Sequence, residues 1–164
     1  MSLARLVVAC AALLVGCSEA PPPEQPIPFN HEIHGKKAKL TCLDCHSGAT
    51  ERARAGFPST QSCLFCHVKP QGDKPTKNER LVRDVVAREG QIRWVQVNRN
   101  PGHVHFSHAM HVVAGKLACV QCHGDVSKWK EPPKSPSPEL STMEACMDCH
   151  RLEGASNNCR VCHK

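Results

Sequence analysis

The sequence predicts a mostly α-helical protein with extensive irregular loops, in which bound cofactors take the place of a hydrophobic core. The chain has 164 residues, which is about the length of one domain. Only 4 % of its residues are aromatic, it has no Tyr, and it contains 13 Pro. A domain of this length normally buries many Leu, Ile, Val and Phe side chains, but the long apolar runs lie mostly in positions 1–16. We therefore expect covalent or metal staples to hold the fold.

The motif C-x-x-C-H occurs five times and identifies the cofactor. Two thiols in this spacing can add to the vinyl groups of a porphyrin, and the histidine that follows can bind its iron. The cysteines are Cys42, Cys45, Cys63, Cys66, Cys119, Cys122, Cys146, Cys149, Cys159 and Cys162. The histidines that follow them are His46, His67, His123, His150 and His163. The sequence thus predicts five covalently bound haem c groups and a small multihaem cytochrome c fold, in which the haems replace the core.

Six further histidines could supply the second axial ligand of each iron, and five are needed. They are His31, His34, His103, His105, His108 and His111. Four of them lie in an internal repeat, F-[NS]-H-x-x-H, which begins at Phe29 and again at Phe106. The offset between the two copies is 106 − 29 = 77, and the first cysteines that follow keep it, since 119 − 42 = 77. The repeat units are 29–68 and 103–150, within a pentahaem domain of 29–164 that ends in a fifth haem segment, 151–164.

The H-x-x-H spacing puts two histidines on one face of a helical turn. Because each iron needs only one more ligand, His31 and His34 should serve different haems, as should His108 and His111. The fifth ligand should be His103 or His105. Only one of these two histidines is needed to complete the set of five, so we expect one to point inward and the other to face water. His103 is the favoured ligand, and His105 would then be a surface or propionate-binding residue.

The N-terminal segment has the features of an export signal. Residues 1–16 contain Arg5 followed by an apolar run, and 14–17 resemble a bacterial lipobox that ends at Cys17. We expect a lipid anchor on Cys17 and a Pro-rich tether over 17–28, which would hold the protein at the periplasmic side of a bacterial membrane. The alternative is an ordinary signal peptide, with Cys17 removed or idle.

Residues 69–97 form an insert between the two repeat units. Thr76 and Glu79 fit a capping box, apolar residues then recur at helical spacing, and Gly90 fits a C-cap. This helix should pack on a haem edge, although a docking face for a partner is an alternative. We also expect Trp94 and Trp129 to pack on porphyrin.

The chain resembles class III multihaem cytochromes c and, more closely, the pentahaem subunit of alternative complex III and related quinol oxidoreductase modules. The resemblance rests on FNHEIH, CLDCH, AGFPSTQSCLFCH, NPGHVHFSHAMH, CVQCHGDV and CMDCHR. It implies that His34 and His111 ligate haems that are distant in sequence. It also implies electron transfer beside other subunits of a quinol oxidoreductase or reductase complex. The family often has a histidine where Asn98 stands, so His103 would replace that ligand.

The leading interpretation is thus a non-catalytic electron carrier whose irons all have two histidine ligands. A pentahaem enzyme of the nitrite or hydroxylamine reductase type would need an open iron position, and the chain has no C-x-x-C-K motif. An extracellular electron-transfer cytochrome is a further alternative, and a zinc or disulfide scaffold is a remote one. The net charge of +6 does not come with a nucleic-acid-binding motif, so no nucleic-acid partner is expected.

Overall fold

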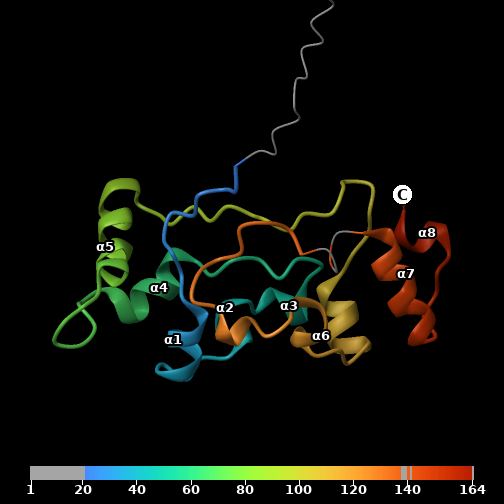
Figure 1. Ribbon diagram of the computed structural model, residues 1–164, viewed down its shortest axis with the longest axis horizontal. Coiled ribbons are helices and arrows are strands. Elements are labelled where there is room, and N and C mark those ends of the chain that lie inside the picture. The colour runs from blue at the N-terminus through green and yellow to red at the C-terminus, as the bar shows by residue number, and fades with distance from the viewer. Residues whose placement is uncertain (1–20, 138–139, 141, 164) are drawn as a thin grey trace, which may run out of the picture.

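The computed structural model is a chain of short helices joined by long loops, and it describes residues 21–137, 140 and 142–163 (Figure 1). The helical elements are α1 (His31–Lys36), α2 (Cys42–Cys45), α3 (Gly48–Glu51), α4 (Thr60–His67), α5 (Lys77–Glu89), the π-helical η1 (Met110–Ala114), α6 (Cys119–His123), the 3-10 turn η2 (Val126–Lys128), α7 (Met143–Leu152) and α8 (Cys159–Cys162). Within the described ranges the β structure amounts to an isolated antiparallel bridge between Val104 and His163. The predicted fold class is confirmed.

Short polar side chains start several of these helices, which explains how such short segments hold their ends. Asn30 Oδ1 accepts a hydrogen bond from the N–H of Ile33 at the start of α1, and Thr142 Oγ1 accepts one from Ala145 in α7. In α5 the Thr76 hydroxyl accepts from the N–H of Glu79, and Gly90 ends the helix at φ = 71°. The predicted start and end of this helix are therefore confirmed.

The hydrophobic core is small and lies at one end of the molecule. Four buried residues form it, namely Ile27, Val82, Val85 and Ile92. They join α5 to the segments before α1 and after α5, and Cys63 of α4 packs against them. Elsewhere large apolar side chains are exposed, with Phe65 at 89 % and Leu152 at 86 %. The polypeptide alone does not cover these side chains, which fits the expectation that cofactors complete the interior.

The two repeat units dock on each other through equivalent contacts. The N–H of Glu32 in α1 donates to the carbonyl of Trp129 after η2, at 3.1 Å. The N–H of Ala109 donates to the carbonyl of Arg52 after α3, also at 3.1 Å. Both donors and both acceptors differ by the repeat offset, since 109 − 32 = 77 and 129 − 52 = 77. Each H-x-x-H turn is thus held by the loop that follows the first C-x-x-C-H motif of the other unit.

The five C-x-x-C-H helices lie in a row along the long axis of the molecule (Figure 1). Their order in space is α4, α2, α6, α7 and α8, with α5 beyond α4 at one end. This order exchanges the first two motifs relative to the sequence. Among the helices that the structure describes, none has the length and apolar composition needed to cross a bilayer.

Candidate metal centres

Each C-x-x-C-H motif lies on a short helical turn that brings its first cysteine and its histidine to the same side. The N–H of His46 donates to the carbonyl of Cys42 at 2.8 Å, and that of His163 donates to Cys159 at 2.8 Å. Residues four apart on a helix are neighbours on its surface, so thiol and imidazole face the same space. None of these ten cysteines is in a disulfide bond, so their sulfur atoms are available for attachment of a cofactor.

The histidines of the motifs face the additional histidines in pairs. Ring centroids are 6.1 Å apart for His34 and His67, 6.3 Å for His108 and His123, 6.0 Å for His111 and His150, and 5.5 Å for His103 and His163. Burial, and then the nearby imidazoles of His46 and His34, lower the pKa of His31 to about 4, so His31 lies within electrostatic reach of His46. The ten histidines predicted as iron ligands thus form four facing pairs, and the fifth pair, His31 and His46, is indicated by this interaction.

Backbone carbonyls orient five of these ten imidazoles. The Nδ1 atoms of His34, His46, His108, His111 and His150 lie 2.7–3.0 Å from the carbonyl oxygens of Asn30, Gly56, Ala53, Ser107 and Ser156, respectively. An imidazole that donates its Nδ1–H to a carbonyl keeps a lone pair on Nε2, which is the arrangement of a metal-binding histidine. The lowered pKa of His31 likewise keeps that ring neutral at pH 7, as a ligand must be.

Each H-x-x-H turn is fixed by the phenylalanine that precedes it. Phe29 stacks on His34 with ring centroids 4.2 Å apart and meets His31 edge-on at 4.8 Å. In the second unit Phe106 stacks on His111 at 4.6 Å and meets His108 edge-on at 4.9 Å. The aromatic residue of the repeat thus sets the direction of both imidazoles, a role that the sequence analysis did not assign to it.

His103 and His105 occupy different places. The backbone of this segment pairs with the end of the chain, where the N–H of His105 donates to the carbonyl of Cys162 at 2.7 Å. This contact places the His103 ring over the ring of His163, with an angle of 19° between their planes. Both histidines are exposed, so the ring of His163 facing His103 is what distinguishes them. The geometry therefore favours His103 as the histidine that faces His163.

The residues fit iron held by a porphyrin better than a bare metal ion. Two imidazoles that bind one metal from opposite sides, each at about 2 Å, have ring centroids roughly 6 Å apart, which matches the observed pairs. Within the described ranges no three or more His, Cys, Asp or Glu side chains gather closely enough to hold a metal ion. Two donors per site leave four positions of an octahedral ion for the ring nitrogens of a porphyrin. The indole Nε1 of Trp94 is also buried without an acceptor, so this donor is available to a polar group of a bound cofactor.

Thiols of motifs that are neighbours in space lie close to one another. Burial raises the pKa of one thiol in each of four pairs, and the other thiol of the pair raises it further. The pairs are Cys63 with Cys45, Cys42 with Cys119, Cys122 with Cys149, and Cys146 with Cys162. Attachment sites that are neighbours in Figure 1 are therefore also neighbours at the level of their cysteines.

One group at the site was missed by the sequence analysis. The Glu79 carboxylate of α5 lies 3.3 Å from Nδ1 of His67, where five of the other imidazoles have a backbone carbonyl. We expected Glu79 to complete a capping box with Thr76. Its side chain instead contacts His67, which lies 12 residues earlier in the chain. The predicted Cys17 anchor and the 1–16 signal peptide lie outside the described residues. Folded contacts begin by Gln25, whose side chain makes two hydrogen bonds with the backbone of Val95.

Comparisons with known proteins agree with this geometry. Residues 104–164 match the family model described as cytochrome c7 and related cytochrome c. The chain is also 34 % identical, over 163 aligned residues, to a protein of Nitratidesulfovibrio vulgaris named menaquinone reductase, multiheme cytochrome c subunit. That alignment covers 86 % of this chain and 77 % of the relative. This chain therefore belongs to the multihaem cytochromes c, within the group related to cytochrome c7.

Proposed function

We propose that this protein carries five haem c groups, each held by two histidines, and that it relays electrons between a periplasmic donor and a membrane complex that reacts with menaquinone. The observation that carries the proposal is the pairing of every motif histidine with one of the additional histidines. The pairs are His46 with His31, His67 with His34, His123 with His108, His150 with His111, and His163 with His103.

Bound haem c supplies one-electron exchange between ferric and ferrous iron. The contribution of the polypeptide would be to hold two imidazoles at each site, which would leave no iron position open to a substrate. A reductase of nitrite or hydroxylamine needs such a position. The facing imidazoles therefore favour an electron carrier over an enzyme.

The placement of the attachment sites supports a relay. The row α4, α2, α6, α7 and α8 extends along the molecule, and thiols of neighbouring sites lie close together (Figure 1). The two sites at the ends, on α4 and α8, would then be those that meet redox partners. His31 and His34 lie on the same short helix, α1, so they would hold two neighbouring sites together as one rigid unit.

The relative indicates the partner and the direction of electron flow. Its name describes a subunit of a menaquinone reductase, so electrons would enter the quinone pool through the complex. The resemblance to alternative complex III instead implied electrons leaving a quinol. We propose the direction given by the relative, with other subunits of a membrane complex as the partners.

We also propose that the protein works at the periplasmic side of the membrane, with a lipid on Cys17 as its anchor. Haem c is attached outside the cytoplasm, and residues 14–17 resemble a lipobox. Cys17→Ala should move the protein from the membrane fraction to the soluble fraction. Equal retention of this variant in the membrane fraction would contradict the anchor.

A haem count tests the cofactor proposal. Pyridine haemochrome analysis of the purified protein should give five haems per chain, and electron paramagnetic resonance of the oxidised protein should give only low-spin ferric signals. A count of four or fewer, or a high-spin signal from intact protein, would overturn it.

The direction of transfer can be tested with membranes that contain the cognate complex. The reduced protein should be oxidised when menaquinone is added to these membranes, as followed by the loss of its reduced α-band. Membranes that lack the complex are the control. Rapid reduction of the oxidised protein by menaquinol, without the reverse reaction, would support the opposite direction and contradict the proposal.

A further inference from the structure

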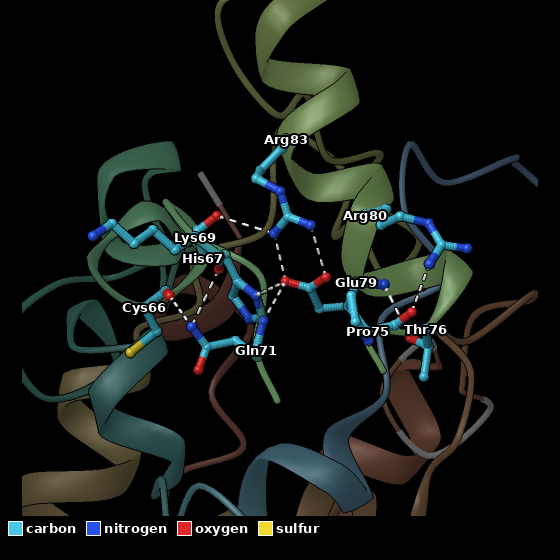
Figure 2. Close-up of polar contacts among 9 residues, drawn as sticks. All are labelled: Cys66, His67, Lys69, Gln71, Pro75, Thr76, Glu79, Arg80 and Arg83. Carbon is cyan, nitrogen blue, oxygen red and sulfur yellow. Dashed lines mark hydrogen bonds and ion pairs between the residues drawn. The ribbon is translucent and has the colours of Figure 1, made fainter. Parts of the chain in front are cut away.

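His67 is set apart from other imidazoles by the acceptor at its Nδ1 atom. Five imidazoles have a backbone carbonyl there, at 2.7–3.0 Å. His67 has the Glu79 carboxylate, with Oε1 at 3.3 Å from Nδ1 (Figure 2). A carboxylate is the stronger acceptor because it carries a full negative charge. The chain thus gives one of its ligand sites a different electronic environment.

The Glu79 carboxylate is held firmly in this position. Arg83, one helical turn later, binds both of its oxygens, with Nη2 donating to Oε2 at 2.8 Å. The N–H of Gln71 lies 3.3 Å from Oε1 (Figure 2). The side chain of Glu79 is only 10 % exposed, and that of His67 is 19 % exposed. Water therefore screens this contact weakly compared with the surface ion pairs of the chain.

The helix that carries Glu79 is itself anchored on α4. Val82 and Val85 of α5 are buried in the hydrophobic core, against which Cys63 of α4 packs. The Thr76 hydroxyl caps α5, but the Glu79 side chain binds His67 and Arg83. A capping role was the local expectation for Glu79, and its departure from that role points to a function for the contact.

Glu79 is placed to act as a carboxylate anion. The guanidinium of Arg83 donates to both of its oxygens, which is the geometry of a bidentate ion pair. An anionic acceptor withdraws the Nδ1 proton of an imidazole and makes its Nε2 a stronger electron donor to a metal. A stronger donor stabilises ferric over ferrous iron.

We propose that Glu79 is a positioning residue that lowers the reduction potential of the iron site on α4. The comparison is with the potential that this site would have if a neutral acceptor contacted His67. The α4 site lies at one end of the row of attachment sites, next to α5 (Figure 1). Glu79 would therefore set the potential at a terminal site, where an electron enters or leaves the chain. The inference rests on the proposed binding of haem by Cys63, Cys66 and His67.

Potentiometric titration of the purified holoprotein, followed at its α-band, tests this role. In Glu79→Gln the side chain keeps its size and loses its charge, so one of five potentials should rise. An expected tenfold change in the reduction equilibrium corresponds to about 59 mV for one electron. The low-spin resonance signal of one site should shift with it. Glu89→Gln is the matched control, because Glu89 lies on the same helix and its ion pair is with the adjacent Arg88.

Unchanged potentials in Glu79→Gln, or the same shift in Glu89→Gln, would overturn the inference.

Arg83→Gln gives an independent measurement should Glu79→Gln fold poorly. It leaves the carboxylate to His67 and the N–H of Gln71 and should lower the same potential, so a rise or no change would count against the proposal. A haem count below five in the unsubstituted protein would refute the proposed function instead. Five haems with unmoved potentials would refute only the role of Glu79.

Discussion

The two repeat units have closely similar structures at their H-x-x-H turns. In both units a phenylalanine stacks on the second histidine of H-x-x-H, at 4.2 Å for Phe29 and 4.6 Å for Phe106. The Nδ1 atom of that histidine contacts the carbonyl four residues earlier, at 2.7 Å in the first unit and 2.8 Å in the second. Even the left-handed backbone at Lys39 recurs at Lys116. A shared sequence pattern has produced a shared local structure.

The units differ at their second C-x-x-C-H motif. His67 contacts the Glu79 carboxylate, supplied by the insert that follows the first unit. His150 contacts the carbonyl of Ser156, supplied by the segment that follows the second unit. The repeat therefore fixes the geometry of the H-x-x-H histidines, and the segment after each unit supplies the environment of its last histidine. Residues 69–97 and 151–164 are therefore the parts of the chain that can give His67 and His150 different surroundings.

Removing the second histidine of H-x-x-H should have the largest effect, and the same effect in both units. His34→Ala and His111→Ala each remove one of two facing imidazoles, so one iron in five should become high-spin and bind carbon monoxide. The stoichiometry of carbon monoxide binding to the reduced protein measures this. His105→Ala is the control, because its side chain is exposed and should leave binding at zero. A variant at His34 or His111 that binds no carbon monoxide would show that the residue is not a ligand.

Much of the site could be predicted from the sequence because its chemistry is local. The two thiols and the histidine of each motif lie within five residues, so their joint function does not depend on the fold. The 77-residue offset predicted two equivalent H-x-x-H turns, and the structure contains them in equivalent surroundings. His103 also faces His163, as proposed, because the segment is extended and pairs with the end of the chain.

Contacts between distant backbone segments could not be predicted in this way. The hydrogen bond from Glu32 to Trp129 joins an N–H to a carbonyl, and every residue except proline offers both groups. No sequence pattern marks such a contact. Glu79 illustrates a different reason, since its spacing from Thr76 fits a local rule, whereas the packing of α5 on α4 brings it to His67. Tertiary packing decided between the two partners.

The docking loops provide the next test of the comparison. Trp129 and Arg52 hold equivalent positions, but the Trp129 ring is half-buried and lies edge-on to His31 at 6.4 Å, whereas Arg52 is exposed. Trp129→Ala should lower the free energy of unfolding of the holoprotein by about 2 kcal/mol, below the value for a fully buried Trp. Arg52→Ala should change it by less than about 0.5 kcal/mol. Guanidinium titration followed by circular dichroism measures both, and equal losses would mean that the Trp129 ring contributes no more than the exposed Arg52 side chain.

The caps of the two H-x-x-H turns should differ by a smaller amount. Asn30 Oδ1 lies 2.9 Å from the N–H of Ile33, whereas Ser107 Oγ lies 3.4 Å from that of Met110. Asn30→Ala should cost about 1 kcal/mol and Ser107→Ala about 0.5 kcal/mol, because a longer hydrogen bond contributes less. The same denaturant titration gives both values. A larger loss for the serine variant would contradict the order that the distances predict.

Substitution of the two lysines with left-handed backbone conformation should change the free energy of unfolding least, and by similar amounts in the two units. Lys39 has φ = 58° and Lys116 has φ = 53°, in equivalent positions of the two linkers. A residue with a Cβ pays about 1–2 kcal/mol in this conformation, while glycine loses roughly 0.5–1 kcal/mol more backbone entropy on folding. Lys39→Gly and Lys116→Gly should therefore each raise the free energy of unfolding by about 0–1 kcal/mol. Lys→Ala at each position separates this effect from the loss of charge, because alanine keeps the Cβ. If glycine destabilised one unit and stabilised the other, the two linkers would differ in more than their sequence, and their equivalence would fail.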